Sequence, residues 1–186
     1  STRDARPYSY ELMASDVATV MEALNVEQAA LVGWSDGACT AVVFASKEPK
    51  RVAGVFFFAC NMDPSGTQEI LEFTPILQRC MGRHMKDYAE LSATPDQFEA
   101  LSDAVSLMQR TQPNYSVSDL AAISVPVVIV QSEHDEFIKR EHAEYLARNI
   151  PHAEYDLLPG VSHFAPLQRP DLFNAALLAF LGKVLP

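Results

Sequence analysis

The chain has 186 residues, of which 48% are hydrophobic and 9% aromatic, a composition typical of a globular protein with a core of its own. Its 24 acidic residues outnumber its 14 basic residues, so the formal net charge at pH 7 is −10. This charge repels phosphate backbones and anionic lipid surfaces, which argues against a nucleic-acid-binding or membrane-binding protein.

The cysteines Cys39, Cys60 and Cys80 have neither the paired spacing of a zinc site nor the even number of a disulfide framework. They fit a reducing compartment. The longest apolar runs are far below the roughly 20 residues that cross a bilayer, and no leader of charged and then apolar residues opens the sequence. These features predict a soluble, cytoplasmic protein.

The first third of the chain alternates helical and extended patterns. Apolar residues recur at three- and four-residue steps over 9–24, which predicts an amphipathic helix with Ser9 as its N-cap. The apolar stretch 29–33 predicts a short buried strand, and the next residues predict a helix that Pro49 stops. Residues 52–59 are continuously apolar, which is typical of a central parallel strand covered on both faces.

The rest of the chain predicts a helical insertion followed by a return to strands and helices. Residues 61–124 contain little strand signal, while apolar residues recur there at helical spacing. The elements expected beyond it are a strand over 125–131, a polar loop, a helix over 139–149, a strand over 153–159, a loop over 160–166 and a helix from Pro170. This order predicts an α/β domain with a mostly parallel sheet and flanking helices.

The stretch Gly33-Trp34-Ser35-Asp36-Gly37 lies between the first predicted strand and the helix that follows it. A turn this tight needs small neighbours, because side chains would collide around a serine held in a strained conformation. The Ser35 hydroxyl is then expected to project from the edge of the sheet. The first amides of the next helix, beginning with that of Asp36, are expected to face a developing oxyanion.

A serine hydroxyl is a poor nucleophile unless a histidine base and an orienting carboxylate accompany it. Asp135 and His163 each follow a predicted strand, so both are expected at the sheet edge that carries Ser35. Other histidines and neighbouring acids compete for these roles: His84, His134, His142, His152, Glu133 and Glu136. A metal site in the acidic loop is disfavoured, because adjacent loop residues rarely converge on one ion.

The chain order Ser35, Asp135, His163 and the segments around these residues resemble the α/β-hydrolase superfamily. By this resemblance "GWSDG" is the nucleophile elbow, "SEHDEFI" the acid loop and "GVSHFAPLQRPDLF" the histidine loop. The resemblance implies Ser35 as the nucleophile, His163 as the general base and acid, and Asp135 as the orienting carboxylate. It also implies the amide of Asp36 as one oxyanion donor, and it implies no cofactor.

The same resemblance implies a hydrolase core over 1–60 and 125–186, with 61–124 as a helical cap-like insertion. Trp34 and Phe164 are expected in the substrate pocket, because each adjoins a predicted catalytic residue. The superfamily places several strands before the elbow strand, and a loop after one of them supplies a second oxyanion donor. These strands are missing from the sequence, so the fold is expected to be N-terminally incomplete. Either a second chain or segment supplies the strands, or the protein is a truncated relative.

The predicted function is that of a serine hydrolase that attacks a small-molecule acyl substrate, a carboxylic ester, through an acyl-enzyme. Hydrolysis of a carbon–carbon bond and aminopeptidase activity are alternatives, because the superfamily supports them on the same triad. A non-catalytic or partner-completed binding protein on a hydrolase scaffold is the remaining class. An aspartyl nucleophile is disfavoured, because Asp36 is one residue out of register with the middle of the elbow.

Overall fold

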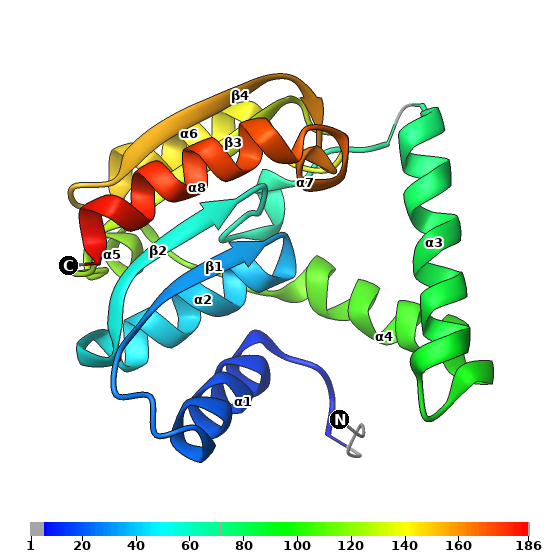
Figure 1. The fold of residues 1–186 in the computed structure, drawn as a ribbon, viewed down its shortest axis with the longest axis horizontal. Coiled ribbons are helices and arrows are strands. Elements are labelled where there is room, and N and C mark those ends of the chain that lie inside the picture. Colours follow the sequence, from blue (N-terminus) through cyan, green and yellow to red (C-terminus); the bar gives the residue numbers. More distant parts are fainter. Residues whose placement is uncertain (1–5, 71, 186) are drawn as a thin grey trace.

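The computed structural model describes residues 6–70 and 72–185 (Figure 1). Residues 1–5 and 186, in the predicted core, and residue 71, in the predicted cap, lie outside the described residues. The strands form one parallel sheet in the order β1-β2-β3-β4. They are β1 (Ala29–Trp34), β2 (Val52–Phe58), β3 (Val127–His134) and β4 (Glu154–Ser162).

Helices connect and cover these strands, as the sequence predicted. The α-helices are α1 (Tyr10–Ala23), α2 (Asp36–Lys47), α3 (Pro75–Leu91), α4 (Phe98–Thr111), α5 (Val117–Ala121), α6 (Arg140–Asn149), α7 (Ala165–Gln168) and α8 (Pro170–Val184). The short 3-10 helices are η1 (Pro49–Arg51), η2 (Pro64–Gly66) and η3 (Pro95–Gln97). The Ser9 hydroxyl caps α1 by accepting a hydrogen bond from the Leu12 amide at 3.1 Å, which confirms the predicted N-cap.

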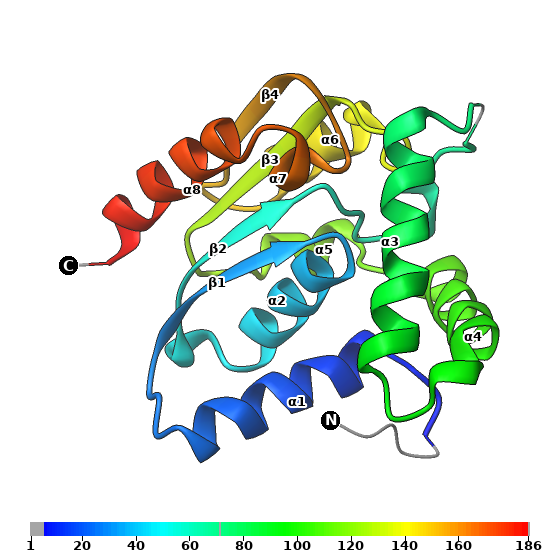
Figure 2. The same cartoon turned by 45° about the vertical axis from the view of Figure 1, so that its right-hand side comes forward.

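Both faces of the sheet are covered, which explains the continuous apolar run of β2 (Figure 2). Phe57 and Ile129 face a buried cluster that includes residues of α1, α2 and α6. Phe56 and Phe58 face the opposite way, where they pack on Phe173 of α8 with ring centroids 5.4 and 5.2 Å apart. The fold class predicted from the sequence is therefore confirmed.

The strands β3 and β4 each continue three residues beyond their predicted ends. Ser132 pairs with Leu158 and His134 pairs with Ser162. The pairing of β3 with β4 therefore continues into the two segments that the sequence predicted as loops. The pairing partner decides where a strand ends, and a single sequence does not show that partner. The consequence is that Asp135 and His163 each follow directly after the last residue of a strand.

The region predicted as a cap contains the helices α3, α4 and α5. Helix α3 stands away from the sheet in both ribbon views (Figures 1 and 2). It is attached through Leu77 and Cys80, which are buried in a small cluster with Phe164. This cluster places the first turns of α3 beside the predicted histidine loop.

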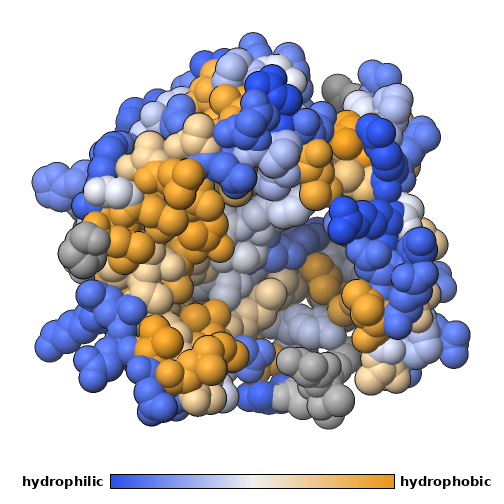
Figure 3. Space-filling view, viewed as in Figure 1, coloured by the Kyte–Doolittle hydropathy of each residue, from blue (hydrophilic) through white to orange (hydrophobic). Residues whose placement is uncertain are grey.

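The first strand, β1, lies at an edge of the described sheet and pairs there with β2 alone. Val32 of β1 is 48% exposed. Apolar side chains are also exposed on α8 and on and just after α1, and they gather over these two helices in Figure 3. They include Val20, Leu24 and Leu178.

Candidate active site

The turn between β1 and α2 has the strained backbone that the sequence predicted. Ser35 has φ 55° and ψ −129°, a positive φ that non-glycine residues adopt rarely. A Cβ atom at Gly33 would lie 2.3 Å from the Ala38 Cα, so only glycine fits where the strand passes the helix. The Ser35 amide donates to the Phe58 carbonyl at 2.9 Å, which ties the turn to the neighbouring strand.

The expectation of steric crowding is wrong for Gly37. A Cβ atom built there meets no described atom within 4 Å, because Gly37 lies on the open side of the first turn of α2. The amide of Asp36 makes no hydrogen bond within the described residues. It stands at the N-terminus of α2, where the helix dipole favours negative charge. This free amide is in keeping with its predicted role as an oxyanion donor.

His163 and Asp135 lie together at the carboxyl ends of β4 and β3. The His163 Nδ1 is 3.1 Å from both carboxylate oxygens of Asp135, and their side chains are 7% and 1% exposed. Asp135 Oδ1 also accepts hydrogen bonds from the amides of Phe137 and Ile138, each at 2.9 Å. These bonds fix the carboxylate, so it can hold one tautomer and one orientation of the imidazole.

The two neighbouring acids have other partners. Glu133 accepts a hydrogen bond from the Gly160 amide at 2.8 Å, and Glu136 accepts one from the His163 amide at 3.0 Å. Neither carboxylate is the partner of the His163 ring. The three acids of the loop therefore hold three different groups of the histidine loop rather than one common point.

The competing histidines have other surroundings, although His134 directly precedes Asp135 and the His84 ring lies 6.4 Å from that of Phe164. His84, His134 and His152 are exposed. His142 is buried in α6, where its Nε2 accepts a hydrogen bond from the Met62 amide at 3.1 Å. Burial lowers the pKa of His142, so it acts as a neutral acceptor that anchors the segment after β2.

Ser35 and His163 are brought to the same sheet edge without being hydrogen-bonded to each other. The hydrogen bonds of His163 within the described part of the chain go to Asp135 and Glu136. The ring of Trp34, the residue before Ser35, lies 6.0 Å from the His163 ring. Bonds between a nucleophile and its base are often long until substrate binds, so this arrangement is compatible with a triad.

Trp34 and Phe164, the two predicted pocket residues, pack against each other with ring centroids 5.9 Å apart. Phe164 is 3% exposed and also contacts the ring of Phe137. Trp34 is half-buried. Phe164 thus forms the contact between the histidine loop and α3, while the lining of a substrate pocket by these two residues stays a prediction.

The Asp36 carboxylate makes contacts that the sequence did not predict. Its two oxygens accept hydrogen bonds from the Tyr10 hydroxyl at 2.7 Å and from the Gln109 side-chain amide at 2.9 Å. Burial, together with the charge of Asp36, raises the pKa of Tyr10 far above its ordinary value. The residue after Ser35 is therefore held from both α1 and α4. The partners lie 26 and 73 residues away in the chain, so no local pattern reveals them.

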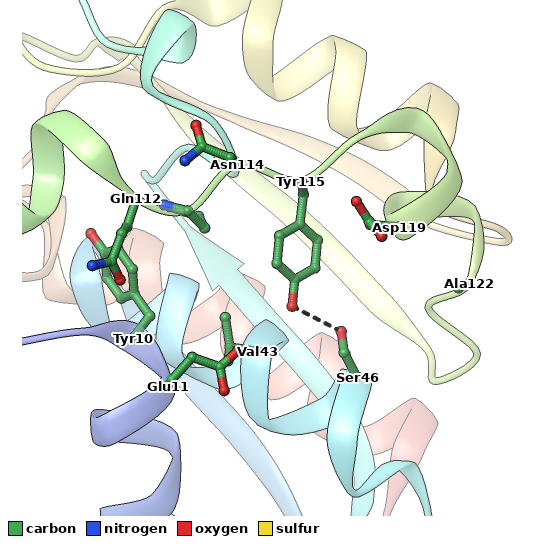
Figure 4. Close-up of a pocket in the computed structure, with 10 residues that line it drawn as sticks. Tyr10, Glu11, Val43, Ser46, Gln112, Asn114, Tyr115, Asp119 and Ala122 are labelled. Atoms are coloured by element: carbon green, nitrogen blue, oxygen red, sulfur yellow. Dashed lines mark hydrogen bonds between the residues drawn. The ribbon is translucent and has the colours of Figure 1, made fainter.

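A cavity of about 510 Å³ lies apart from the predicted triad, between α1, α2 and the segment joining α4 to α5 (Figure 4). Tyr10 and Glu11 line one side and Tyr115 the other, where its hydroxyl is 3.4 Å from the Ser46 hydroxyl. Neither Ser35 nor His163 lines this cavity.

Comparison with known proteins identifies the family to which this fold belongs. The sequence matches the model of the alpha/beta hydrolase family over residues 2–176. The chain belongs to this family. A mouse (Mus musculus) relative named Serine hydrolase BPHL is 25% identical over 181 residues, which cover 92% of this chain and 61% of that protein. The chain therefore spans less than two thirds of that relative.

One further relative and one solved structure extend the comparison. The 2-hydroxy-6-oxo-6-phenylhexa-2,4-dienoate hydrolase of Burkholderia cepacia is 27% identical over 200 residues, covering 91% of this chain and 68% of that protein. The structure of a thermophilic esterase from Thermogutta terrifontis superposes with a TM-score of 0.72 at 20% identity. That superposition covers 100% of this chain and 76% of the esterase, and it shows the shared fold.

Two sequence expectations concern the surroundings of the protein. Within the residues that the structure describes, no helix is both long and apolar enough to cross a membrane. The three cysteines are buried free thiols, and burial raises the pKa of Cys39. Cys39 thus behaves as a small apolar residue beneath the elbow. Cytoplasmic location stays a prediction.

Proposed function

We propose that the protein is a serine hydrolase that cleaves a small carboxylic ester through an acyl-enzyme. The observation that carries the proposal is the buried His163–Asp135 pair, 3.1 Å apart, at the sheet edge where Ser35 has a positive φ. A buried hydrogen bond between a carboxylate and an imidazole is expected where the imidazole must be held as a base.

Ser35, His163 and the Asp36 amide have distinct roles in the proposed reaction. His163 takes the proton of the Ser35 hydroxyl while the serine oxygen attacks the ester carbonyl, and the Asp36 amide donates to the resulting oxyanion. The tetrahedral intermediate expels the alcohol, which receives that proton from His163. Water then attacks the acyl-enzyme by the same route and releases the acid, restoring the Ser35 hydroxyl.

A second candidate is hydrolysis of a carbon–carbon bond by the same residues. The relative named for 2-hydroxy-6-oxo-6-phenylhexa-2,4-dienoate favours this candidate. The two activities differ in the leaving group, which is an alcohol in one and a carbon acid in the other. Parallel assays with a p-nitrophenyl ester and with that dienoate separate them, and the larger kcat/KM identifies the substrate class.

The deciding experiment is labelling with a fluorophosphonate, followed by mapping of the modified peptide. An activated serine reacts covalently, so we expect the label on Ser35 and its loss in Ser35→Ala and His163→Ala. Ser46 is a matched control, because it is a serine of the following helix whose hydroxyl approaches Tyr115. Labelling that persists in Ser35→Ala, or a wild-type protein that resists the label, would contradict the proposal.

We propose in addition that a strand from outside residues 1–186 pairs with the edge of β1. The support is the edge of β1 that no other described strand covers, together with the 48% exposure of Val32. Such a segment could carry the second oxyanion donor. Intact mass and native mass of the purified material test this, because a second polypeptide or a longer chain is the expected result.

A further inference from the structure

Glu136 lies between the predicted histidine loop and the first helix of the predicted cap. Its Oε2 accepts a hydrogen bond from the His163 amide at 3.0 Å. Its Oε1 accepts one from the Thr74 hydroxyl at 3.2 Å. The side chain is half-buried, so water screens these bonds less than it would on an open surface. One carboxylate is thus shared by two segments that are far apart in the sequence.

The catalytic imidazole is held by three consecutive residues of the acid loop. Asp135 binds the ring of His163, Glu136 binds its backbone amide, and the Phe137 ring packs against it with centroids 4.7 Å apart. Asp135 fixes the side-chain torsions of His163, because it binds the ring at Nδ1. Glu136 fixes the point of the backbone from which the ring projects.

The other end of the Glu136 contact is the N-cap of α3. The Thr74 oxygen accepts a hydrogen bond from the Leu77 amide at 3.3 Å while its hydroxyl proton goes to Glu136. Leu77 is buried against Phe164, the residue after His163. The start of α3 therefore contacts the histidine loop through one polar link and one apolar link.

The segment leading into α3 also runs along the acid loop. The Gln68 amide donates to the Phe137 carbonyl at 2.8 Å, and the Lys139 amide donates to the Gly66 carbonyl at 2.9 Å. These backbone bonds hold the far side of the acid loop. Movement of α3 relative to this frame would be taken up at Thr74 and Glu136.

We propose that Glu136 is a positioning residue that couples the placement of α3 to the placement of His163. The inference rests on the proposed function, because it assigns a partner to the base of that reaction. Hydrogen bonds weaken steeply with distance and angle, so a shift of α3 changes how firmly the carboxylate holds the His163 amide. A substrate that packs under α3 would thereby affect the alignment of the base.

The first test is amide hydrogen exchange at His163, which needs no activity. Removal of the acceptor in Glu136→Ala is expected to speed exchange at His163 by about tenfold or more. Thr74→Val removes only the hydroxyl of the cap residue, and we expect it to speed the same exchange several-fold. Wild-type exchange at His163 in Thr74→Val would overturn the inference, because no coupling would then reach the histidine.

Two variants serve as matched controls. Glu133→Ala removes an acceptor from the same histidine loop, at Gly160, without touching α3. It is expected to leave exchange at His163 unchanged. Glu136→Gln keeps both bonds, because its amide oxygen accepts from His163 and its NH₂ group donates to Thr74. In this variant we expect the His163 amide to exchange as slowly as in the wild type. Faster exchange would contradict the hydrogen bonds assigned to Glu136.

The second test uses ester hydrolysis by the complete protein. A misplaced base lowers turnover more than binding, so Glu136→Ala is expected to reduce kcat by about 10- to 100-fold with KM within about twofold. Glu136→Gln should restore kcat to within about threefold. In the double variant Glu136→Ala/Thr74→Val, the fold decrease in kcat should be smaller than the product of the decreases in the two single variants.

The two proposals fail in distinguishable ways. If Glu136→Ala hydrolyses the ester at the wild-type rate, the coupling is wrong while the serine hydrolase stands. If the wild type is not labelled at Ser35, the proposed function is wrong, and exchange at His163 in Thr74→Val still decides whether the link from α3 exists.

Discussion

The elbow and the histidine loop place Ser35 and His163 by different means. At the elbow, Ser35 is positioned by the backbone. It has a positive φ, Gly33 packs so closely on α2 that an added Cβ would lie 2.3 Å from the Ala38 Cα, and the Ser35 amide donates one hydrogen bond to β2. At the histidine loop, His163 is positioned by side chains, with Asp135 on its ring and Glu136 on its amide. A steric constraint and a polar network thus meet at one sheet edge.

This difference indicates how each part can fail. A backbone turn set by close packing should be lost together with the fold, because the clash involves main-chain atoms that cannot move aside. A side-chain network should lose function while the fold persists, because each bond contributes little to the free energy of unfolding. The predictions below separate these two kinds of failure, from the largest expected effect to the smallest.

Asp135→Asn should have the largest effect, and it should act on turnover alone. The Asn oxygen can keep the bonds from the Phe137 and Ile138 amides, which turns its NH₂ group toward His163 Nδ1. The imidazole is then held in the wrong tautomer, and kcat is expected to fall by roughly 10⁴-fold. Steady-state ester hydrolysis measures this, and thermal unfolding should show a Tm near that of the wild type.

Glu133→Gln is the control for that substitution, since it neutralises an exposed acid of the same loop. Its Oε1 can still accept from the Gly160 amide, so kcat should stay within about twofold of the wild type. A comparable loss in both variants would mean that the charge of the loop, rather than the Asp135–His163 pair, sets the rate.

Gly33→Ala should unfold the elbow. The added Cβ meets main-chain atoms of Ala38 and Gly37 at 2.3 to 2.5 Å, so the strand and helix must separate. We expect the free energy of unfolding to fall by about 3 kcal/mol or more in urea titrations. Gly37→Ala meets nothing within 4 Å and should change it by less than about 1 kcal/mol, with either sign. Equal losses at the two glycines would refute the steric explanation.

Gln109→Leu tests the polar support of the elbow. It removes the donor from one oxygen of Asp36 and leaves the Tyr10 bond in place. The free energy of unfolding should fall by about 1.5 to 2 kcal/mol, because a partly buried carboxylate loses a hydrogen bond. Gln112→Leu, on the segment after α4, is the comparison variant and should have less than half this effect. Urea titration of both variants decides the point.

His142 should make stability depend on pH. Burial lowers its pKa below 6.5, so the unfolded chain takes up a proton below pH 6.5 that the folded chain does not. The free energy of unfolding should therefore fall as pH drops from 7 toward the lowered pKa, by at most about 1.4 kcal/mol per pH unit. His142→Gln should flatten this slope, whereas the exposed His134→Gln should not. Urea titrations at several pH values provide the measurement.

The sequence predicted what depends on near neighbours. Hydrophobic periodicity predicted the helix over 9–24, a continuous apolar run predicted the strand over 52–59, and the serine between Gly33 and Gly37 predicted the elbow. Contacts between distant residues were not predictable in the same way. Glu136 meets Thr74 across 62 positions, and Asp36 meets Gln109 across 73. Only the folded chain brings such pairs together, so the sequence singled out both acids for other roles and did not reveal these partners.

The β3–β4 ladder is a similar case. The polar stretch after Gln131 predicted a loop, yet pairing with β4 continues to His134. Gly37 is the reverse case, a glycine whose neighbourhood in the sequence predicted crowding that the structure does not have. In each case the spatial neighbour, and not the residue type, decides the outcome.

The order of the described strands has a consequence for how the chain folds during synthesis. The strands lie in the sheet in the order in which they occur in the chain, each beside its predecessor. During synthesis, each strand from β2 onward would therefore emerge after the strand with which it pairs. No pair of strands that has already formed would have to separate to admit it. Chains fold as they emerge, from the N-terminal part onward. This sheet can grow by addition at one side, and β4 with its histidine loop completes it last.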